Sequence, residues 1–330
     1  MKTRSFGSTG RQVSEIGLGT WQLGGAEWGD VPESQALETL RVAAEEGITF
    51  IDTADIYGDG RSERIIGRFL KERPDRDKFF VATKLGRSSD PGWPQNFEPD
   101  AIRRHTEGSL ERLGVKSIDL TQTHCIPHEE VRKGKVFAAL AQLKREGLIK
   151  AFGASVESMD EAKTCLDVEG LEALQIIFNV FRQKPIEAIF ERAKRQKVAI
   201  IVRLPLASGL LSGKFKRDQQ FGEKDHRNFN RDGQAFNVGE TFAGLGLEKG
   251  VELADALKSF VPAETPMAQW ALRWCLDFDA VTTVIPGATR PEQARQNASA
   301  STAPPIAAET HEKLRDFYQQ RVAEHVRGSY

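Results

Sequence analysis

Four polar side chains each fall at or just after the end of a short apolar run, and together they have the types needed to move a proton. They are Asp52, Tyr57, Lys84 and His124. In a parallel α/β protein the carboxyl ends of the strands meet on one rim, where active sites form. The other two tyrosines, Tyr318 and Tyr330, lie close to the C-terminal end of the sequence. Tyr57 is therefore the candidate phenol.

A free phenol has a pKa of about 10 and is a poor proton donor near neutral pH. An ammonium beside it stabilises the phenolate and lowers that pKa, and a buried ammonium needs a carboxylate partner. We therefore predict Tyr57 as the acid, Lys84 as the group that tunes it and Asp52 as the counter-ion. A neutral His124 would orient a carbonyl oxygen by donating one hydrogen bond.

Each of these residues also has an ordinary structural interpretation. Asp52 could accept turn hydrogen bonds, Tyr57 could pack, and His124 could be a core histidine. Lys84 could be a solvated loop lysine or, in a barrel aldolase, a lysine that forms a Schiff base with its substrate. The four residues form an acid-base device only if the fold brings them together.

Short apolar runs alternate with amphipathic stretches along the chain, which predicts a (β/α)₈ TIM barrel. A doubly wound open sheet is the alternative, but the glycine-rich turn that it needs after its first strand is absent from the sequence. The predicted strands are Ile16–Leu18, Ile48–Ile51, Phe79–Thr83, Ile118–Gln122, Ile149–Gly153, Ala173–Phe178, Ala199–Arg203 and Val281–Ile285. The predicted helices are Glu33–Glu46, Ser62–Lys71, Pro99–Leu113, Glu129–Glu146, Ser158–Asp167, Lys184–Gln196 and Gly250–Phe260.

We interpret residues 1–330 as one barrel domain with three additions. Residues 1–15 form an N-terminal β-hairpin, and residues 204–240 form a long loop at the C-terminal face of the strands. Residues 307–330 form a C-terminal helix with a frayed tail. A further loop, Gly86–Phe97, carries Trp93. Long loops on this face are either functional lids or surface decoration.

Composition restricts the class of protein. The formal net charge of −1 gives no general attraction to nucleic acid or to an anionic membrane. We find no apolar run of membrane-spanning length and no signal-peptide core, and we expect a cytoplasmic protein. The three cysteines are far apart and odd in number, which favours neither disulfides nor a zinc site. We therefore predict no metal.

Several motifs occur in the same order as in a known family. They begin at Gly17-Leu-Gly19-Thr20-Trp21 and include Asp52-Thr-Ala-x-x-Tyr57-Gly, Thr83-Lys84, Asp119-Leu-x-Gln-x-His124, Gly153-Ala-Ser155, Pro205-Leu-Ala-Ser-Gly209 and Ile285-Pro-Gly287-Ala-Thr-Arg290. In these motifs the chain resembles the aldo-keto reductase superfamily. The resemblance extends to about Ala300 and implies a (β/α)₈ barrel that binds NADP(H), with the Asp-Tyr-Lys-His tetrad at positions 52, 57, 84 and 124.

The resemblance also implies which residues hold the cofactor. Arg290 can bind a 2′-phosphate, so we expect NADPH in preference to NADH. Arg290 has a plain alternative as a helix cap. The implied cofactor residues are Gly19, Thr20, Trp21, Asp52, Ser155, Gln175, Arg203, Leu206, Ser208, Gly209, Lys214, Gly287, Thr289, Arg290, Gln293 and Asn297. Of these, Ser155 and Gln175 would hold the carboxamide.

The chain departs from the family pattern at three positions. Val156 stands where the family often has Asn, and Gly287 stands where many relatives have Lys. Arg203 replaces the aromatic ring that usually stacks on the nicotinamide, and a planar guanidinium can also stack there. Our hypothesis is that the charge of Arg203 disfavours the cationic oxidised ring and favours carbonyl reduction.

The implied activity is reduction of aldehydes or ketones to alcohols, with a small-molecule carbonyl substrate and no nucleic-acid or membrane partner. The substrate mouth is predicted to be apolar, and its residues are Trp21, Trp28, Trp93 and Cys125. The alternative function is a cofactor-sensing binding subunit with little turnover. The sequence specifies neither the physiological carbonyl nor the oligomeric state.

Overall fold

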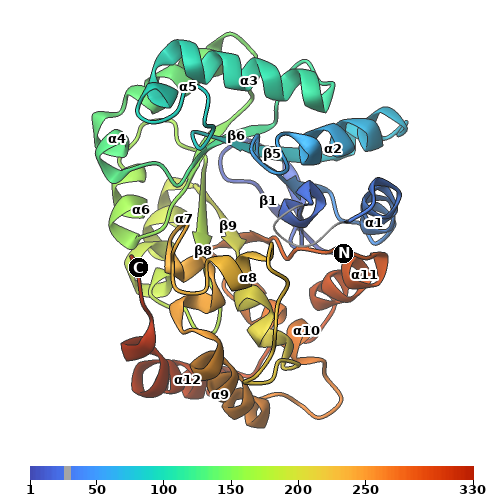
Figure 1. Ribbon diagram of the computed structural model, residues 1–330, viewed down its shortest axis with the longest axis vertical. Helices are drawn as coiled ribbons and strands as arrows, with labels where there is room; N and C mark the ends of the chain where they lie inside the picture. The colour runs from blue at the N-terminus through green and yellow to red at the C-terminus, as the bar shows by residue number, and fades with distance from the viewer. Residues whose placement is uncertain (26–30) are drawn as a thin grey trace.

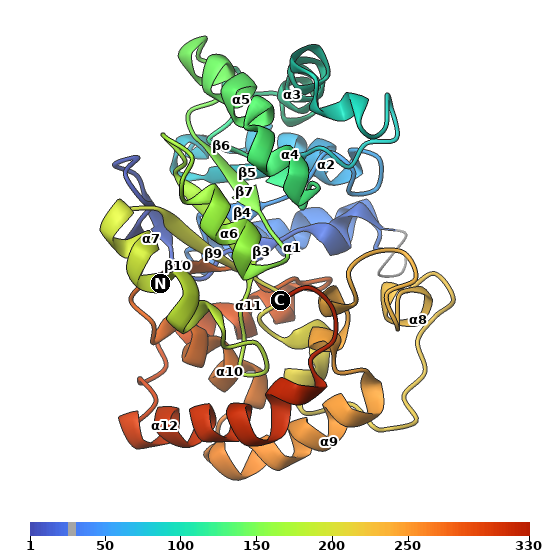
Figure 2. The ribbon, with the colours of Figure 1, turned by 90° about the vertical axis from the view of Figure 1, so that its left-hand side faces the viewer.

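A barrel of parallel strands with helices outside it forms the body of the protein (Figures 1 and 2). The computed structural model describes residues 1–25 and 31–330. The strands are β1 (Thr3–Ser5), β2 (Gln12–Ser14), β3 (Leu18–Gly19), β4 (Phe50–Asp52), β5 (Phe80–Leu85), β6 (Leu120–His124), β7 (Phe152–Ser155), β8 (Ala173–Ile177), β9 (Ala199–Arg203) and β10 (Val281–Val284).

The eight strands β3 to β10 pair in chain order, and backbone hydrogen bonds join the first to the last. Gly17 N–H donates to the Val284 carbonyl at 2.8 Å, and Gly19 N–H donates to that of Pro286 at 3.1 Å. Val284 N–H donates in return to Glu15 at 2.9 Å. These bonds close the sheet, as a (β/α)₈ barrel requires and as a doubly wound open sheet does not. The predicted fold class is confirmed.

Helices lie between the strands along the chain. They are α1 (Glu33–Glu45), α2 (Arg61–Lys71), α3 (Pro99–Leu113), α4 (His128–Lys133), α5 (Lys135–Arg145), α6 (Met159–Cys165), α7 (Glu191–Gln196), α8 (His226–Phe229), α9 (Leu247–Leu257), α10 (Met267–Leu276), α11 (Pro291–Ala298) and α12 (Ala308–Phe317). Among the described residues, no helix combines the length and apolarity needed to cross a bilayer.

The prediction of one helix over Glu129–Glu146 is wrong. The chain forms two helices there, α4 and α5, which meet at Gly134 with a φ of 71°. A left-handed residue ends a helix because its backbone turns the chain out of the α-helical path, and glycine adopts that conformation without a steric penalty. The apolar spacing continued across Gly134 and concealed this break.

Five strands, β3 to β7, extend one or two residues beyond their predicted ends, and three of them end in a polar residue. β4, β6 and β7 end at Asp52, His124 and Ser155. These last residues are polar, so an apolar pattern cannot detect them, yet they are buried and paired with neighbouring strands. The candidate residues therefore lie on regular strands rather than on the loops after them, which holds their side chains more rigidly.

The hairpin closes the bottom of the barrel. β1 and β2 pair antiparallel, and the ring of Phe6 between them packs 4.5 Å from that of Phe80 and 5.7 Å from that of Phe50. Because Phe6 is fully buried, truncating it to alanine would lower the free energy of unfolding by about 3–5 kcal/mol.

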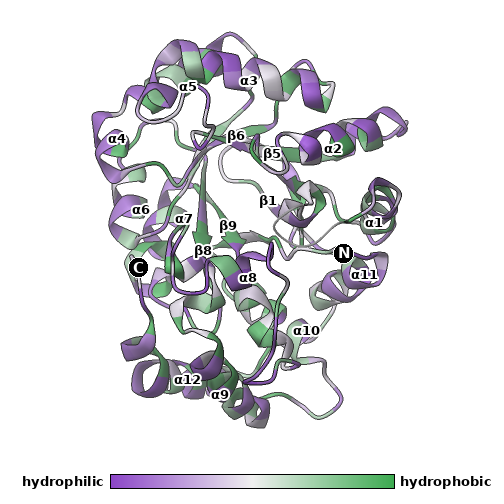
Figure 3. Ribbon diagram, viewed as in Figure 1, coloured by the Kyte–Doolittle hydropathy of each residue, from purple (hydrophilic) through white to green (hydrophobic). Residues whose placement is uncertain are grey.

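Figure 3 shows β8 and β9 in the hydrophobic colour, whereas the outer helices carry both colours.

The prediction of a frayed C-terminal tail is also wrong. α12 continues through a π-helical turn, Tyr318–Val322, and the chain then runs back toward the strands (Figures 1 and 2). The Tyr330 hydroxyl accepts a hydrogen bond from Lys184 N–H at 2.9 Å. This anchoring joins residues 146 positions apart, so no local pattern reveals it.

Candidate active site

Lys84 lies at the centre of the candidate site, fully buried on β5. Its ammonium donates hydrogen bonds to Asp52 Oδ1 at 2.6 Å, to the Thr53 carbonyl at 2.8 Å and to the Tyr57 hydroxyl oxygen at 3.2 Å. Burial disfavours the charged ammonium, but the interactions with Asp52 and Tyr57 stabilise it more strongly. They raise the pKa of Lys84 above its usual value. Since all three N–H groups are used and the amine stays protonated, Lys84 is poorly suited to form a Schiff base.

Tyr57 reaches the site from the turn after β4. Gly58 has a φ of 60°, and a Cβ built on it would lie 2.0 Å from the Gly24 carbonyl oxygen. The chain therefore needs glycine immediately after the tyrosine in order to pack against the segment Trp21–Gly24. The Trp21 ring stacks beside the Tyr57 ring at 6.1 Å. This packing holds the phenol over Lys84.

The pKa of Tyr57 differs in direction from our expectation. Burial raises the pKa of the phenol above 10, and the nearby Lys84 ammonium offsets that rise only in part. The expected lowering by Lys84 is therefore present but is outweighed by burial. Because Lys84 donates to the phenol oxygen, the Tyr57 proton is left to point at another acceptor.

His124 completes the group from the end of β6. Its ring lies edge-on to the Tyr57 ring, with the centroids 5.8 Å apart. Burial lowers the pKa of His124 well below 6.5, and the cations Arg87, Lys84 and Arg203 lower it further. The imidazole is therefore neutral at physiological pH and has one N–H to donate.

Two glutamines hold the second oxygen of Asp52. Gln175 on β8 donates to Asp52 Oδ2 at 2.7 Å, and Gln122 on β6 lies 3.4 Å from the same atom. We expected Gln175, with Ser155, to be free for a carboxamide, but here its amide nitrogen is directed at Asp52. Gln122 belongs to the motif that ends at His124, but we expected no role for it at the site. Its position two residues before His124 could have identified it, because alternate residues of a strand share a face.

A cavity of about 590 Å³ extends from Tyr57 and His124 to α11. Lys84 lies behind Tyr57, outside the set of lining residues. Every residue that the sequence analysis assigned to the cofactor lines this cavity. They are Gly19, Thr20, Trp21, Asp52, Ser155, Gln175, Arg203, Leu206, Ser208, Gly209, Lys214, Gly287, Thr289, Arg290, Gln293 and Asn297.

A left-handed turn lines the middle of the cavity. Ala207, Ser208 and Gly209 have φ values of 49°, 56° and 100° in succession. The Ala207 and Gly209 N–H groups are used inside this turn, where they donate to the Leu204 and Leu206 carbonyls at 3.0 and 2.9 Å. An anion would therefore be held mainly by the cations Lys214 and Arg290, which also line the cavity. The size of the cavity and these cations fit a dinucleotide better than a compact metabolite.

Gln293 and Gln22 shape the far end of the cavity. Gln293 Oε1 accepts hydrogen bonds from the N–H groups of Thr289 and Arg290, at 2.8 and 3.2 Å, and so fixes the start of α11. A Cβ built on Gly287 would lie 2.1 Å from Gln22 Nε2. The Gln22 side chain thus occupies the space that a lysine at position 287 would need.

The comparisons with known proteins agree with this geometry. The model of the aldo/keto reductase family matches residues 15–319. The chain belongs to the aldo/keto reductase family. Over 302 residues it is 32% identical to aldo-keto reductase YhdN of Bacillus subtilis, covering 89% of this chain and 86% of the relative. Over 319 residues it is 30% identical to the NADH-specific methylglyoxal reductase of Escherichia coli, covering 91% of this chain and 93% of the relative.

A solved structure supports the same assignment. The holo form of aldo-keto reductase AKR11C1 from Bacillus halodurans superposes with a TM-score of 0.77 at 27% identity, covering 96% of each chain. The barrel and its surrounding helices are therefore those of an aldo-keto reductase. Members of the family are oxidoreductases that use nicotinamide cofactors.

Of the described residues predicted for the substrate mouth, Trp93 and Cys125 do not line the cavity. Trp28 lies outside the described residues. Trp93 is 52% exposed and donates its indole N–H to the Gly86 carbonyl in its own loop. Cys125 is buried, with its sulfur 3.6 Å from Ser155 Oγ. Trp21 does line the cavity, and the ring of Phe236 lies 6.0 Å from that of Trp21.

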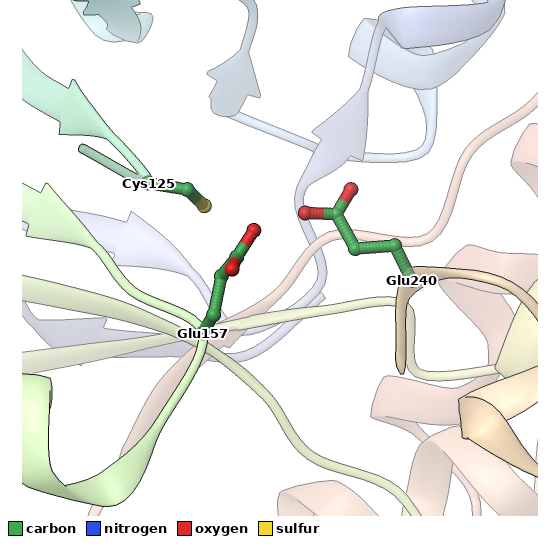
Figure 4. Close-up of side chains that lie close together, drawn as sticks. All are labelled: Cys125, Glu157 and Glu240. Atoms are coloured by element: carbon green, nitrogen blue, oxygen red, sulfur yellow. The ribbon is translucent and has the colours of Figure 1, made fainter. Parts of the chain in front are cut away.

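Cys125, Glu157 and Glu240 gather beside the cavity, with one possible ligand atom of each within 4.8 Å of the others (Figure 4). Two guanidinium groups already pair with them. Arg87 lies 3.0 Å from Glu157 and 3.6 Å from Glu240, and Arg203 lies 3.3 Å from Glu240. Burial also raises the pKa of the Cys125 thiol, so a thiolate ligand is disfavoured. We interpret this cluster as a buried ion network rather than a metal centre.

Proposed function

We propose that this aldo-keto reductase uses NADPH to reduce aldehydes or ketones to alcohols, with Tyr57 as the general acid. The observation that carries the proposal is the hydrogen bond from the Lys84 ammonium to the Tyr57 hydroxyl oxygen, at 3.2 Å, at the closed end of the long cavity. A phenol held in this way has its proton directed at whatever oxygen binds between it and His124.

In the proposed reaction, the carbonyl carbon would accept a hydride that a nicotinamide held in this cavity would supply. Tyr57 donates its proton to the carbonyl oxygen as negative charge develops there. Lys84 stabilises the phenolate that remains, and the buried Asp52 carboxylate balances the ammonium. The neutral His124 donates a hydrogen bond that orients the carbonyl. Electrostatic stabilisation arranged before the reaction starts is commonly the largest part of such catalysis.

Two observations favour NADPH over NADH. Arg290 is exposed at the start of α11, and Lys214 lines the same cavity. Guanidinium and ammonium groups bind a phosphate monoester strongly, and only the 2′-phosphate of NADPH offers one at the adenosine end. The E. coli relative named as NADH-specific is a reason to test this choice directly.

The substrate in this proposal is a small carbonyl compound. Trp21 provides an aromatic wall beside Tyr57, and Phe236 extends it. Aromatic walls with a few convergent polar groups are typical of sites for small organic ligands.

We also propose that the protein acts in the cytoplasm, because its cysteines Cys125, Cys165 and Cys275 are buried and unpaired.

The proposal is tested by comparing wild type with Tyr57→Phe. We expect wild type to oxidise NADPH in the presence of members of an aldehyde panel, followed as loss of nicotinamide absorbance. In Tyr57→Phe we expect kcat to fall by about 10²–10⁴-fold, because the acid is lost. NADPH binding, measured by fluorescence, should stay within about twofold. Phe260→Leu, a conservative change at a partly buried ring that does not line the cavity, is the control.

Two results would count against the proposal. Equal turnover in wild type and Tyr57→Phe would remove Tyr57 from the role of acid. Tight NADPH binding by wild type with no turnover on any aldehyde would favour the cofactor-sensing binding subunit.

A further inference from the structure

Arg182 is a fully buried cation, and its closest partners are residues 329 and 330. Its guanidinium carbon lies 3.8 Å from the centre of the Tyr330 ring, and Nη2 donates to the Ser329 carbonyl at 3.1 Å. Burial lowers the pKa of Arg182 to about 10, because removal from water disfavours the charged form. Among the described residues, no carboxylate lies within ion-pair distance of Arg182. The aromatic face and the carbonyl compensate this cation instead.

Tyr330 is itself fixed from two sides. Its hydroxyl accepts hydrogen bonds from Lys184 N–H at 2.9 Å and from the Tyr318 hydroxyl at 3.2 Å. The Lys184 ammonium lies 4.4 Å from the centre of its ring. These contacts connect residue 330 both to the segment after β8 and to the turn that continues α12.

The same arginine reaches the turn Phe242–Gly244. Arg182 Nη1 lies 3.4 Å from the Ala243 carbonyl oxygen, and Arg327 Nε donates to the Gly244 carbonyl at 2.9 Å. Phe242 and Ala243 have φ values of 52° and 56°. Non-glycine residues adopt this left-handed conformation only where their surroundings hold them there. Arg182 and residues 327–330 supply part of that restraint.

The other side of the turn belongs to the active site. Phe242 N–H donates to Ser208 Oγ at 3.1 Å, and that hydroxyl donates to the Glu240 carbonyl at 3.1 Å. Ser208 lies on the turn that lines the middle of the cavity, the cofactor turn of the proposed function, and the Glu240 carboxylate lies 3.3 Å from Arg203 on the cavity wall. The short segment 239–244 therefore contacts both the C-terminal residues 327–330, which we call the tail, and the cavity.

The interface between this segment and the tail leaves no spare room. A Cβ built on Gly239 would lie 2.5 Å from Arg182 Nη1, and one on Gly328 would lie 2.7 Å from Val238 Cγ1. Side chains at these positions would push the segment away from the tail. Such close packing transmits a displacement rather than absorbing it.

We propose that Arg182 and Tyr330 are positioning residues for the active site. Neither lines the cavity. They hold the Phe242–Gly244 turn in its left-handed conformation, and through it they fix Ser208 on the cofactor turn and Glu240 beside Arg203. The effect on catalysis rests on the proposed function, whereas the restraint on the turn does not.

Tyr330→Ala and Tyr330→Phe test this role. Tyr330→Ala removes the ring over Arg182, and Tyr330→Phe keeps the ring but removes the hydroxyl. In hydrogen–deuterium exchange of the cofactor-free protein, the amides of residues 237–246 should exchange faster in Tyr330→Ala than in wild type. In Tyr330→Phe their exchange should be close to that of wild type. The Kd for NADPH should rise roughly tenfold or more in Tyr330→Ala, while kcat at saturating NADPH stays within about threefold. Arg321→Ala, on the exposed side of the same C-terminal segment, is the control.

Each outcome decides one part of the proposal. Unchanged exchange at residues 237–246 in Tyr330→Ala would overturn the restraint. Lost protection, or a lowered melting temperature, with an unchanged Kd would show that the tail has only a structural role. Failure of wild type to bind NADPH would overturn the proposed function and the positioning role together, and the exchange result would still decide whether the tail holds the turn.

Discussion

The Glu240 carboxylate lies 3.3 Å from the Arg203 guanidinium, and both side chains are about nine-tenths buried on the cavity wall. Arg203 is therefore not an isolated cation. From the sequence we expected its charge to disfavour the oxidised nicotinamide, but in the structure an anion stands beside it. The electrostatic effect on a bound cofactor depends on the pair rather than on Arg203 alone.

Substitutions of the two partners should shift the cofactor preference in opposite directions. Glu240→Gln leaves Arg203 uncompensated and should weaken NADP⁺ relative to NADPH by roughly tenfold, since a buried charge acts over several ångströms at low effective dielectric. Arg203→Tyr removes the cation nearest Glu240, leaves that carboxylate with Arg87 alone, and should strengthen NADP⁺ relative to NADPH. The ratio of the two Kd values, measured by fluorescence titration, tests this. A shift of the same sign in both variants would contradict the account.

The rate of reduction should be independent of pH between 6.5 and 9. The pKa of His124 is lowered well below 6.5, and that of Tyr57 is raised above 10. Both groups therefore keep the protonation state that the proposed reaction needs throughout this window: His124 neutral and Tyr57 protonated. The measurement is kcat/KM for an aldehyde across that range. An inflection inside the window that His124→Gln removes would show that the histidine titrates near its ordinary value.

Asp55 should make the fold less stable as pH rises. Burial and the neighbouring Glu63 carboxylate raise the pKa of Asp55 to about 7, against 3.8 for the unfolded chain, and its Oδ1 has no hydrogen-bond partner. The folded state thus binds more protons between these two values. Stability therefore falls as pH rises through this window, and the loss is complete above pH 7.

Asp55→Asn should remove this dependence. We expect a higher melting temperature at pH 8, from at most about 4 kcal/mol of added stability, and little change at pH 4. Thermal unfolding followed by circular dichroism at the two pH values provides the measurement. Asp59→Asn, at an exposed position four residues away, is the control. Equal shifts at both pH values would mean that ionisation of Asp55 is not the cause.

Arg290 should determine the choice between the two cofactors. Arg290→Ala should weaken NADPH by roughly tenfold to a hundredfold, the usual value of a hydrogen bond to a charged group, and leave NADH within about twofold. Arg295→Ala serves as the control, because Arg295 lies on the same helix but faces Glu46. If NADPH and NADH weakened equally, Arg290 would be a helix cap without contact to the 2′-phosphate.

The sequence predicted which polar residues come together better than it predicted where the strands and helices end. Asp52, Lys84 and His124 were identifiable because each lies at or next to the C-terminal end of a strand that could be predicted from the sequence. The break at Gly134 and the polar ends of β4, β6 and β7 were missed. Apolar periodicity records which residues face the core, and it is insensitive to a left-handed glycine or to a polar residue on the inside of a barrel.

Glu240, Arg87 and Arg182 could not be predicted at all. None lies in a motif, and their roles come from partners far along the chain, such as Arg203 for Glu240 and Tyr330 for Arg182. Whether a charged residue is solvated or buried depends on what the rest of the chain places around it. That information is absent from local spacing.

The sequence by itself determined the barrel and indicated the four polar residues that the barrel brings together, because alternating strands and helices and the residue types near strand ends are local properties. Only the tertiary structure decided the direction of the pKa shift at Tyr57, the pairing of Arg203 with Glu240 and the anchoring of Tyr330 on Arg182. Each of these depends on desolvation and on charges brought together from distant segments. Both quantities arise only when the chain is folded.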